Sequence, residues 1–200
     1  MKEFWSDRIR SLTPYTPGEQ PKGRKFIKLN TNENPYPPSP KALAAIQANT
    51  DASLRLYSDP DAADLRAAIA KTYSVKPEQV FVGNGSDEVL AFAFQAFYSE
   101  GSEIVFSDIT YSFYPVYANM FGIRYRTVPL KADFTVPVDA LCGGNDGVVI
   151  ANPNAPTGME LPQSEIRRVL EANPNVVVIV DEAYVDFGGE SVLPLIEEYP

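Results

Sequence analysis

An aspartate and a tyrosine follow the most apolar segment of the chain. Residues 176–180 are five β-branched residues in a row; Asp181 comes directly after them, and Tyr184 follows three residues later. A run without polar alternation predicts a strand that is buried on both faces of a parallel sheet. In open α/β sheets, ligands bind just beyond the carboxyl ends of the strands. Asp181 is therefore suited to hold the protonated ring nitrogen of a bound cofactor, or alternatively it caps the turn that follows.

A glycine turn, Gly83-Asn-Gly-Ser-Asp87, precedes a predicted helix. Glycine lets the backbone approach a ligand closely, and the first amides of a helix favour a phosphate. The segment lacks the lysine of a P-loop and the third glycine of a dinucleotide-binding fingerprint. The segment therefore predicts either a phosphate-binding turn or an ordinary turn in which Ser86 is the helix N-cap.

Two other segments follow predicted strands and carry candidate ligand contacts. Tyr111 could stack on a planar ring, although tyrosines more often belong to the core. The segment Asn152-Pro-Asn-Ala-Pro-Thr-Gly158 contains two prolines, which predict an irregular loop that presents an amide side chain above the sheet edge. A plain turn is the alternative for this loop.

The chain alternates between strand and helix patterns from residue 80 onward. This alternation predicts an α/β fold with three layers, α/β/α, and a mostly parallel central sheet. Residues 1–40 are predicted to be an extended arm and residues 41–200 a large ligand-binding domain. Because the chain stops after a segment that should lead into another strand, we expect this sheet to be incomplete at its C-terminal end. The predicted strands are 80–82, 103–106, 123–128, 147–151 and 176–180, and the predicted helices are 40–49, 60–73, 87–98, 112–121 and 162–172.

Composition excludes several classes of function. A net charge of −9 argues against a nucleic-acid or acidic-membrane partner, and no apolar run reaches the ~18 residues of a membrane span. The chain has no histidine and one cysteine, Cys142, so neither a zinc site nor Ser-His-Asp or Cys-His catalysis is expected. Cys142 is expected to be a small buried residue. These limits fit a cytoplasmic enzyme that takes its chemistry from an organic cofactor.

Five segments carry a resemblance when they are read together: Leu29-Asn-Thr-Asn-Glu33-Asn-Pro35, Tyr57-Ser-Asp-Pro60, Gly83-Asn-Gly-Ser-Asp-Glu88, Asn152-Pro-Asn-Ala-Pro-Thr-Gly158 and Asp181-Glu-Ala-Tyr-Val-Asp-Phe187. In this order they resemble the fold-type-I pyridoxal-phosphate aminotransferases, and within these the histidinol-phosphate aminotransferase family most closely. The resemblance runs from about residue 8 to residue 200. It implies pyridoxal 5′-phosphate as cofactor and transamination of L-histidinol phosphate with 2-oxoglutarate. The same cofactor motifs occur in aromatic aminotransferases and threonine-phosphate decarboxylases, which remain alternatives.

The resemblance also implies a role for matching residues. Asp181 would pair with the pyridinium nitrogen, Tyr184 and Asn154 would contact the ring's phenolate oxygen, and Tyr111 would stack on the ring. The segment Gly85, Ser86 and Asp87 would hold the phosphate, and Tyr57 would reach the phosphate of a neighbouring subunit in a homodimer. Ala155 stands where the family more often has an asparagine, which leaves Asn152 as a second candidate for the ring oxygen. Asn30, Asn32, Glu33 and Tyr36 lie in a segment that resembles a substrate-side lid, without individual roles.

One element of the family pattern is not found in these residues. The family forms a Schiff base with a lysine that follows the Asp-Glu-Ala-Tyr motif, whereas no lysine follows Lys131 here. No catalytic residue is therefore assigned, and the lysine and the substrate-binding arginines are expected beyond Pro200. We accordingly expect the 200-residue chain alone to be inactive, and a non-catalytic binding or assembly domain remains an alternative.

Overall fold

The computed structural model describes residues 4–13, 18–19, 23 and 27–199, which fall into two compact units. One unit combines residues 4–13 with residues 81–199, and the other extends from residue 18 to Val80. The predicted boundary between an arm and a large domain at residue 40 stays a prediction.

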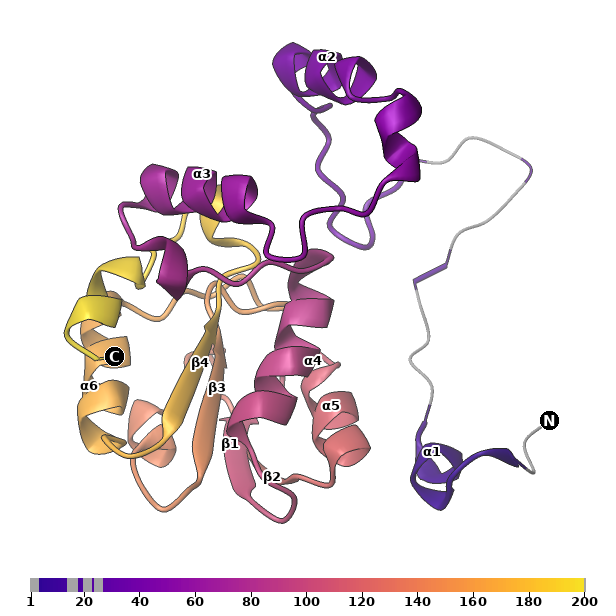
Figure 1. Ribbon diagram of the computed structural model, residues 1–200. Helices are drawn as coiled ribbons and strands as arrows, with labels where there is room; N and C mark the ends of the chain where they lie inside the picture. The colour runs from indigo at the N-terminus through magenta and orange to yellow at the C-terminus, as the bar shows by residue number, and fades with distance from the viewer. Residues whose placement is uncertain (1–3, 14–17, 20–22, 24–26, 200) are drawn as a thin grey trace. The chain divides into compact units, whose positions relative to one another are not determined.

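A parallel sheet of four strands forms the centre of the first unit. Its order is β2-β1-β3-β4, and every neighbouring pair is parallel. Helices α4 and α5 cover one face and α6 covers the other, as Figure 1 shows. The predicted three-layer α/β/α fold is therefore confirmed. The elements are β1 (Glu103–Ser107), β2 (Arg124–Val128), β3 (Gly147–Ala151), β4 (Val177–Asp181), α4 (Gly85–Phe97), α5 (Tyr114–Phe121) and α6 (Gln163–Ala172).

Alternating side chains of β1 divide the core into two clusters. Ile104 and Phe106 pack with α4 and α5, whereas Val105 packs with α6 on the opposite face. Phe94 of α4 and Ile166 of α6 are fully buried in these respective clusters. Because both faces are covered, β1 and β3 are the nearly continuous apolar strands that parallel sheets require.

Two predicted strands differ from the structure. The strand predicted at residues 176–180 is present as β4, shifted by one residue to Val177–Asp181. Every residue of β4 is only half-buried, because β4 is the last strand in the sheet order. Residues 80–82 form no strand, since they pair with none of the four strands. Phe81 instead remains largely exposed and contacts Phe92 of α4 edge-on, at 5.8 Å between ring centroids.

The second unit contains the two helices that the sequence predicts before residue 80. In α2 (Pro40–Ala48), the Ser39 hydroxyl accepts a hydrogen bond from the Ala42 amide, which is the predicted N-cap. Before α3 (Ala63–Tyr73), the Asp59 carboxylate accepts the Ala63 amide at 2.7 Å. These amide hydrogen bonds lower the pKa of Asp59, the bond from Ala63 contributing most. Short 3-10 helices complete this unit at Ala52–Arg55 and Pro77–Gln79.

The described apolar residues of the predicted arm are exposed within this single chain. Trp5 is 46% exposed, and Ile27 and Leu29 are each 90% exposed. Tyr15 and Phe26, two other apolar residues of this segment, lie outside the described residues. The remaining short helices are α1 (Asp7–Ser11) and the 3-10 turns Val138–Leu141, Val185–Phe187 and Leu193–Glu197.

Cys142 is half-buried rather than fully buried. Its thiol contacts the Val138 carbonyl at 3.4 Å and packs against the α6 side of the core. Burial raises the pKa of this thiol.

None of the helices in the described part of the chain is long and apolar enough to cross a membrane.

Candidate functional site

A cavity of about 110 Å³ lies where β3 and β4 end and α4 begins. Five residues that the sequence predicts as ligand contacts line it together: Ser86, Asp87, Tyr111, Asp181 and Tyr184. The rest of its wall is small and apolar, formed by Ala151, Pro153, Ala155 and Ala183. The cavity thus occupies the edge of the sheet at which open α/β folds bind ligands.

Asp181 is the last residue of β4, paired in register with Ala151 at the end of β3. Both of its carboxylate oxygens have partners. Oδ2 accepts the Tyr114 hydroxyl at 2.8 Å, and Oδ1 accepts the Ala183 amide at 3.2 Å. Asp181 therefore caps the turn after the strand and also faces the cavity, so the two interpretations of this residue are compatible.

The start of α4 differs from the turn that the sequence predicts. The helix begins at Gly85, whose positive φ of 78° suits glycine, and Ser86 is not its N-cap. The Glu88 carboxylate accepts the Asn84 amide at 2.7 Å instead. Ser86 and Asp87 consequently lie in the first helical turn, where amides have no intrahelical partner and favour an anion.

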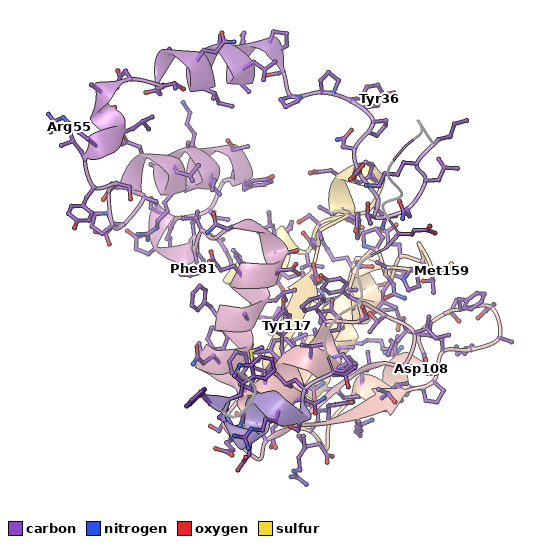
Figure 2. The ribbon with its side chains drawn as sticks, turned by 90° about the vertical axis from the view of Figure 1, so that its right-hand side faces the viewer. Tyr36, Arg55, Phe81, Asp108, Tyr117 and Met159 are labelled. Carbon is purple, nitrogen blue, oxygen red and sulfur yellow. The ribbon has the colours of Figure 1, made fainter. Side chains whose placement is uncertain are left out.

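The Asp87 side chain is held by two tyrosines rather than directed at a ligand. Its Oδ1 accepts the Tyr111 hydroxyl at 2.5 Å. The Tyr117 hydroxyl donates to the Asp87 carbonyl at 2.9 Å and lies 3.4 Å from Oδ1. Tyr117, labelled in Figure 2, links α5 to the beginning of α4 in this way. Of the predicted phosphate contacts, Asp87 would thus offer its amide, because its carboxylate is occupied and carries the wrong charge.

Tyr111 and Tyr184 contribute aromatic surface to the cavity. Tyr111 is half-buried, with its ring stacked on Phe113 at 5.7 Å between centroids. Tyr184 is also half-buried and lies at 6.4 Å from the Phe187 ring. Both rings stand at the cavity wall, where a planar ligand would meet them.

The two asparagines of the proline-containing loop are buried and bonded within the protein. Both hydrogens of the Asn154 amide are donated, to the Ile109 carbonyl and the Thr157 hydroxyl, each at 2.9 Å. The Asn152 side chain bridges to Leu161, accepting its amide at 2.8 Å and donating to its carbonyl at 3.1 Å. Neither lines the 110 Å³ cavity; Asn154 instead lines a neighbouring cavity of about 400 Å³. A contact of either amide with a ring oxygen stays a prediction.

The other predicted residues belong to the second unit. Tyr57 and Tyr36 are exposed there. The Asn30 amide donates to the Glu19 carbonyl at 2.9 Å, and Glu33 pairs with Lys28. The roles that the resemblance implies for Tyr57 and for the lid segment stay predictions.

Two tyrosines of the site were not assigned from the sequence. Tyr114 and Tyr117 hold Asp181 and Asp87, and with Tyr111 they recur at intervals of three residues. Residues three apart lie on one side of a helical turn. This spacing is the signal that could have grouped them, although it does not reveal where the hydroxyls point.

The residues present fit the cofactor that the resemblance implies. Two carboxylates and no cationic side chain line the cavity, which favours a protonated ring. Its volume approaches that of the ~150 Å³ engineered cavity that holds benzene, so it is on the scale of one aromatic ring. The first amides of α4 offer a place for a phosphate beside it.

Comparison with known proteins agrees with this geometry. The family model "Aminotransferase class I and II" matches residues 24–200. The chain belongs to this family. It is 56% identical over 200 residues to a histidinol-phosphate aminotransferase of Acetobacter pasteurianus, covering all of this chain and 56% of the relative. A histidinol-phosphate aminotransferase of Clostridium acetobutylicum is 52% identical over 199 residues, with the same coverage. The chain thus spans a little over half the length of these curated relatives.

Solved structures show the same relationship for the fold. The histidinol-phosphate aminotransferase of Sinorhizobium meliloti, solved in complex with pyridoxal 5′-phosphate, superposes with a TM-score of 0.82 at 26% identity. This match covers 97% of the chain and 55% of that structure. The L-threonine-O-3-phosphate decarboxylase of Porphyromonas gingivalis superposes with a TM-score of 0.62 at 28% identity, over 76% of the chain and 46% of that structure. The fold predicted from the motifs is therefore that of this aminotransferase group.

Proposed function

We propose that the protein transfers an amino group between L-histidinol phosphate and 2-oxoglutarate with pyridoxal 5′-phosphate as cofactor. The observation that carries this proposal is the cavity at the ends of β3 and β4, in which five of the predicted ligand contacts converge. The relatives that match the whole chain at 52–56% identity support histidinol phosphate as the substrate. The activity in question belongs to a protein of the relatives' length.

Bound pyridoxal phosphate supplies an electron sink for the substrate carbanion. The residues of this chain would bind and tune it. Asp181 would hold a proton on the ring nitrogen, because a nearby anion favours the charged form of the ring. Ser86 and the first amides of α4 would bind the phosphate. Tyr111 would contact the ring face and Tyr184 the ring oxygen.

We further propose a homodimer with shared sites, located in the cytoplasm. The support for the dimer is Tyr57, which is fully exposed in the single chain and matches the residue that the family directs at a neighbouring subunit's phosphate. An exposed tyrosine that reaches a partner's phosphate would gain a charge-assisted hydrogen bond.

A threonine-phosphate decarboxylase is the second candidate, supported by the structural likeness to the Porphyromonas gingivalis enzyme. Its substrate shares a phosphate and an amine with histidinol phosphate. The likeness covers less of the chain than the match with the Sinorhizobium meliloti aminotransferase. An assay for release of carbon dioxide from threonine phosphate separates the two reactions.

The test of the proposed function compares two substitutions in β4 and the turn after it. In a protein of the relatives' length, Asp181→Asn should slow transamination of histidinol phosphate, at a cost of about 2–4 kcal/mol of transition-state stabilisation, the scale of one electrostatic partner. Asp186→Asn removes the same charge from an exposed position that does not line the cavity, and should leave turnover nearly unchanged. Near-normal turnover in Asp181→Asn would refute the role of Asp181. Absence of cofactor binding by the unmodified protein would refute the proposed function itself.

A further inference from the structure

The Tyr114 side chain combines a buried ring with a hydroxyl at the site. Tyr114 is the first residue of α5 and is fully buried. Its ring lies parallel to Phe94 at 6.3 Å and edge-on to Phe106 at 5.7 Å. Packing against two core residues from different elements fixes the direction of the hydroxyl. That hydroxyl donates to Asp181 Oδ2 at 2.8 Å.

The two contacts of Asp181 together fix the plane of its carboxylate. The Tyr114 hydroxyl holds Oδ2 from the helical layer, and the Ala183 amide holds Oδ1 from the turn after β4. A carboxylate held at only one oxygen can rotate about its Cβ–Cγ bond. Both hydrogen bonds go to a carboxylate, an acceptor that strengthens each of them relative to a bond between neutral groups. The Tyr114 contact is the shorter of the two and the one that a side chain supplies.

Tyr114 is suited to act as a permanent donor. Burial, and then the neighbouring Asp181 charge, raises the pKa of Tyr114 far above its usual value. The hydroxyl therefore keeps its proton at neutral pH, and Asp181 receives a hydrogen bond rather than a second negative charge.

We propose that Tyr114 is a positioning residue, which orients the Asp181 carboxylate toward the ring nitrogen of the cofactor. The proposal rests on the proposed function, and it assigns to Tyr114 a part in the chemistry without contact with substrate. The ring of Tyr114 serves the core, and its hydroxyl serves the site. Replacing Tyr114 by phenylalanine separates these two contributions, because the ring stays and the hydroxyl is lost.

The experiment measures binding of pyridoxamine 5′-phosphate, which needs no covalent bond to the protein. Dissociation constants are compared for the unmodified protein, Tyr114→Phe and Tyr98→Phe. Tyr98 is a matched control: it is also buried, and its hydroxyl donates to the Val177 carbonyl at 3.2 Å, at the opposite end of β4. Tyr114→Phe should weaken binding about 10-fold, because a carboxylate that can rotate no longer holds its orientation toward the ring nitrogen. Tyr98→Phe should leave the dissociation constant unchanged.

A spectroscopic readout distinguishes positioning from a general loss of structure. With pyridoxamine phosphate labelled with ¹⁵N in the ring, the nitrogen chemical shift reports whether the ring is protonated. Tyr114→Phe should move this shift toward the unprotonated value at a pH where the unmodified complex is protonated, while Tyr98→Phe should not. Far-UV circular dichroism checks that all three proteins are folded.

The outcomes separate this inference from the proposed function. If the unmodified protein binds pyridoxamine phosphate and Tyr114→Phe changes neither affinity nor the ¹⁵N shift, the positioning role is wrong and the proposed function stands. If Tyr114→Phe fails to fold, incorporation of 4-aminophenylalanine at position 114, which keeps the ring and a donor at its para position, must restore both the fold and the shift for the role to hold. If the unmodified protein binds no pyridoxamine phosphate, both proposals fall.

Discussion

Asn154 offers a direct choice between a role in the fold and a role in binding. Its side chain makes three hydrogen bonds in the protein: it donates to the Ile109 carbonyl and the Thr157 hydroxyl, and it accepts the Thr110 hydroxyl at 2.7 Å. It is only 6% exposed. Each bond contributes a net ~1 kcal/mol, so Asn154→Ala should lower the free energy of unfolding by roughly 3 kcal/mol. That change shifts the unfolding equilibrium more than 100-fold, by about 1.4 kcal/mol for each factor of ten.

The assay is urea unfolding of cofactor-free protein, followed by far-UV circular dichroism. Removing the cofactor keeps any binding energy out of the measured free energy. Asn119→Ala is the control, because Asn119 is exposed on α5 and surface substitutions usually change stability by less than ~0.5 kcal/mol. If Asn154→Ala also stays within ~0.5 kcal/mol of the unmodified protein but binds the cofactor weakly, Asn154 acts on the ligand and its role in holding the fold is refuted.

Three other substitutions test the packing and the assembly. Gly147→Ala would place a methyl carbon 2.8 Å from Cζ of Tyr98 and closer still to Cε1, so it should lower the free energy of unfolding by about 1–3 kcal/mol. In a protein that also carries Tyr98→Leu, the same substitution should cost less. Equal costs with and without Tyr98→Leu would argue against the clash. Ile166→Ala empties a fully buried position and should cost about 2–5 kcal/mol in the same urea assay, a value below 1 kcal/mol being inconsistent with its burial. Tyr57→Phe should weaken cofactor affinity by roughly 1.5–3 kcal/mol without dissociating the proposed dimer, and light scattering that finds an active monomer would contradict the shared site.

The elements from residue 103 to residue 181 were largely predictable, because each has a strong local signal. Strand β3 is an unbroken apolar run, and Gly122 ends α5 in the left-handed conformation that glycine favours. The short run Val80-Phe-Val82 was predicted to be a strand from residue types alone. Strand formation also requires a neighbour to pair with, and no local pattern contains that information.

The composition of the site was predictable in part. Asp181, Tyr184 and Ser86 were identified because each follows or begins an element whose end must lie at the same sheet edge. The burial of β4 was overestimated, since a run of β-branched residues does not reveal whether the strand lies in the middle or at the end of the sheet order. The hydroxyl contacts of Tyr114 and Tyr117 were missed, because they depend on how α5 packs against α4 and the sheet.

The three tyrosines of the segment 111–117 place core volume and site chemistry in the same side chains. A single-base change converts a tyrosine codon into a phenylalanine codon, which removes one hydroxyl and keeps nearly the whole packing volume. Natural variation can therefore adjust the support of Asp87 and Asp181 one hydrogen bond at a time, at little risk to the α4–α5 layer. A library restricted to phenylalanine and tyrosine at these three positions would contain eight combinations. Measuring activity and stability for each would show which hydroxyls affect activity and which affect folding.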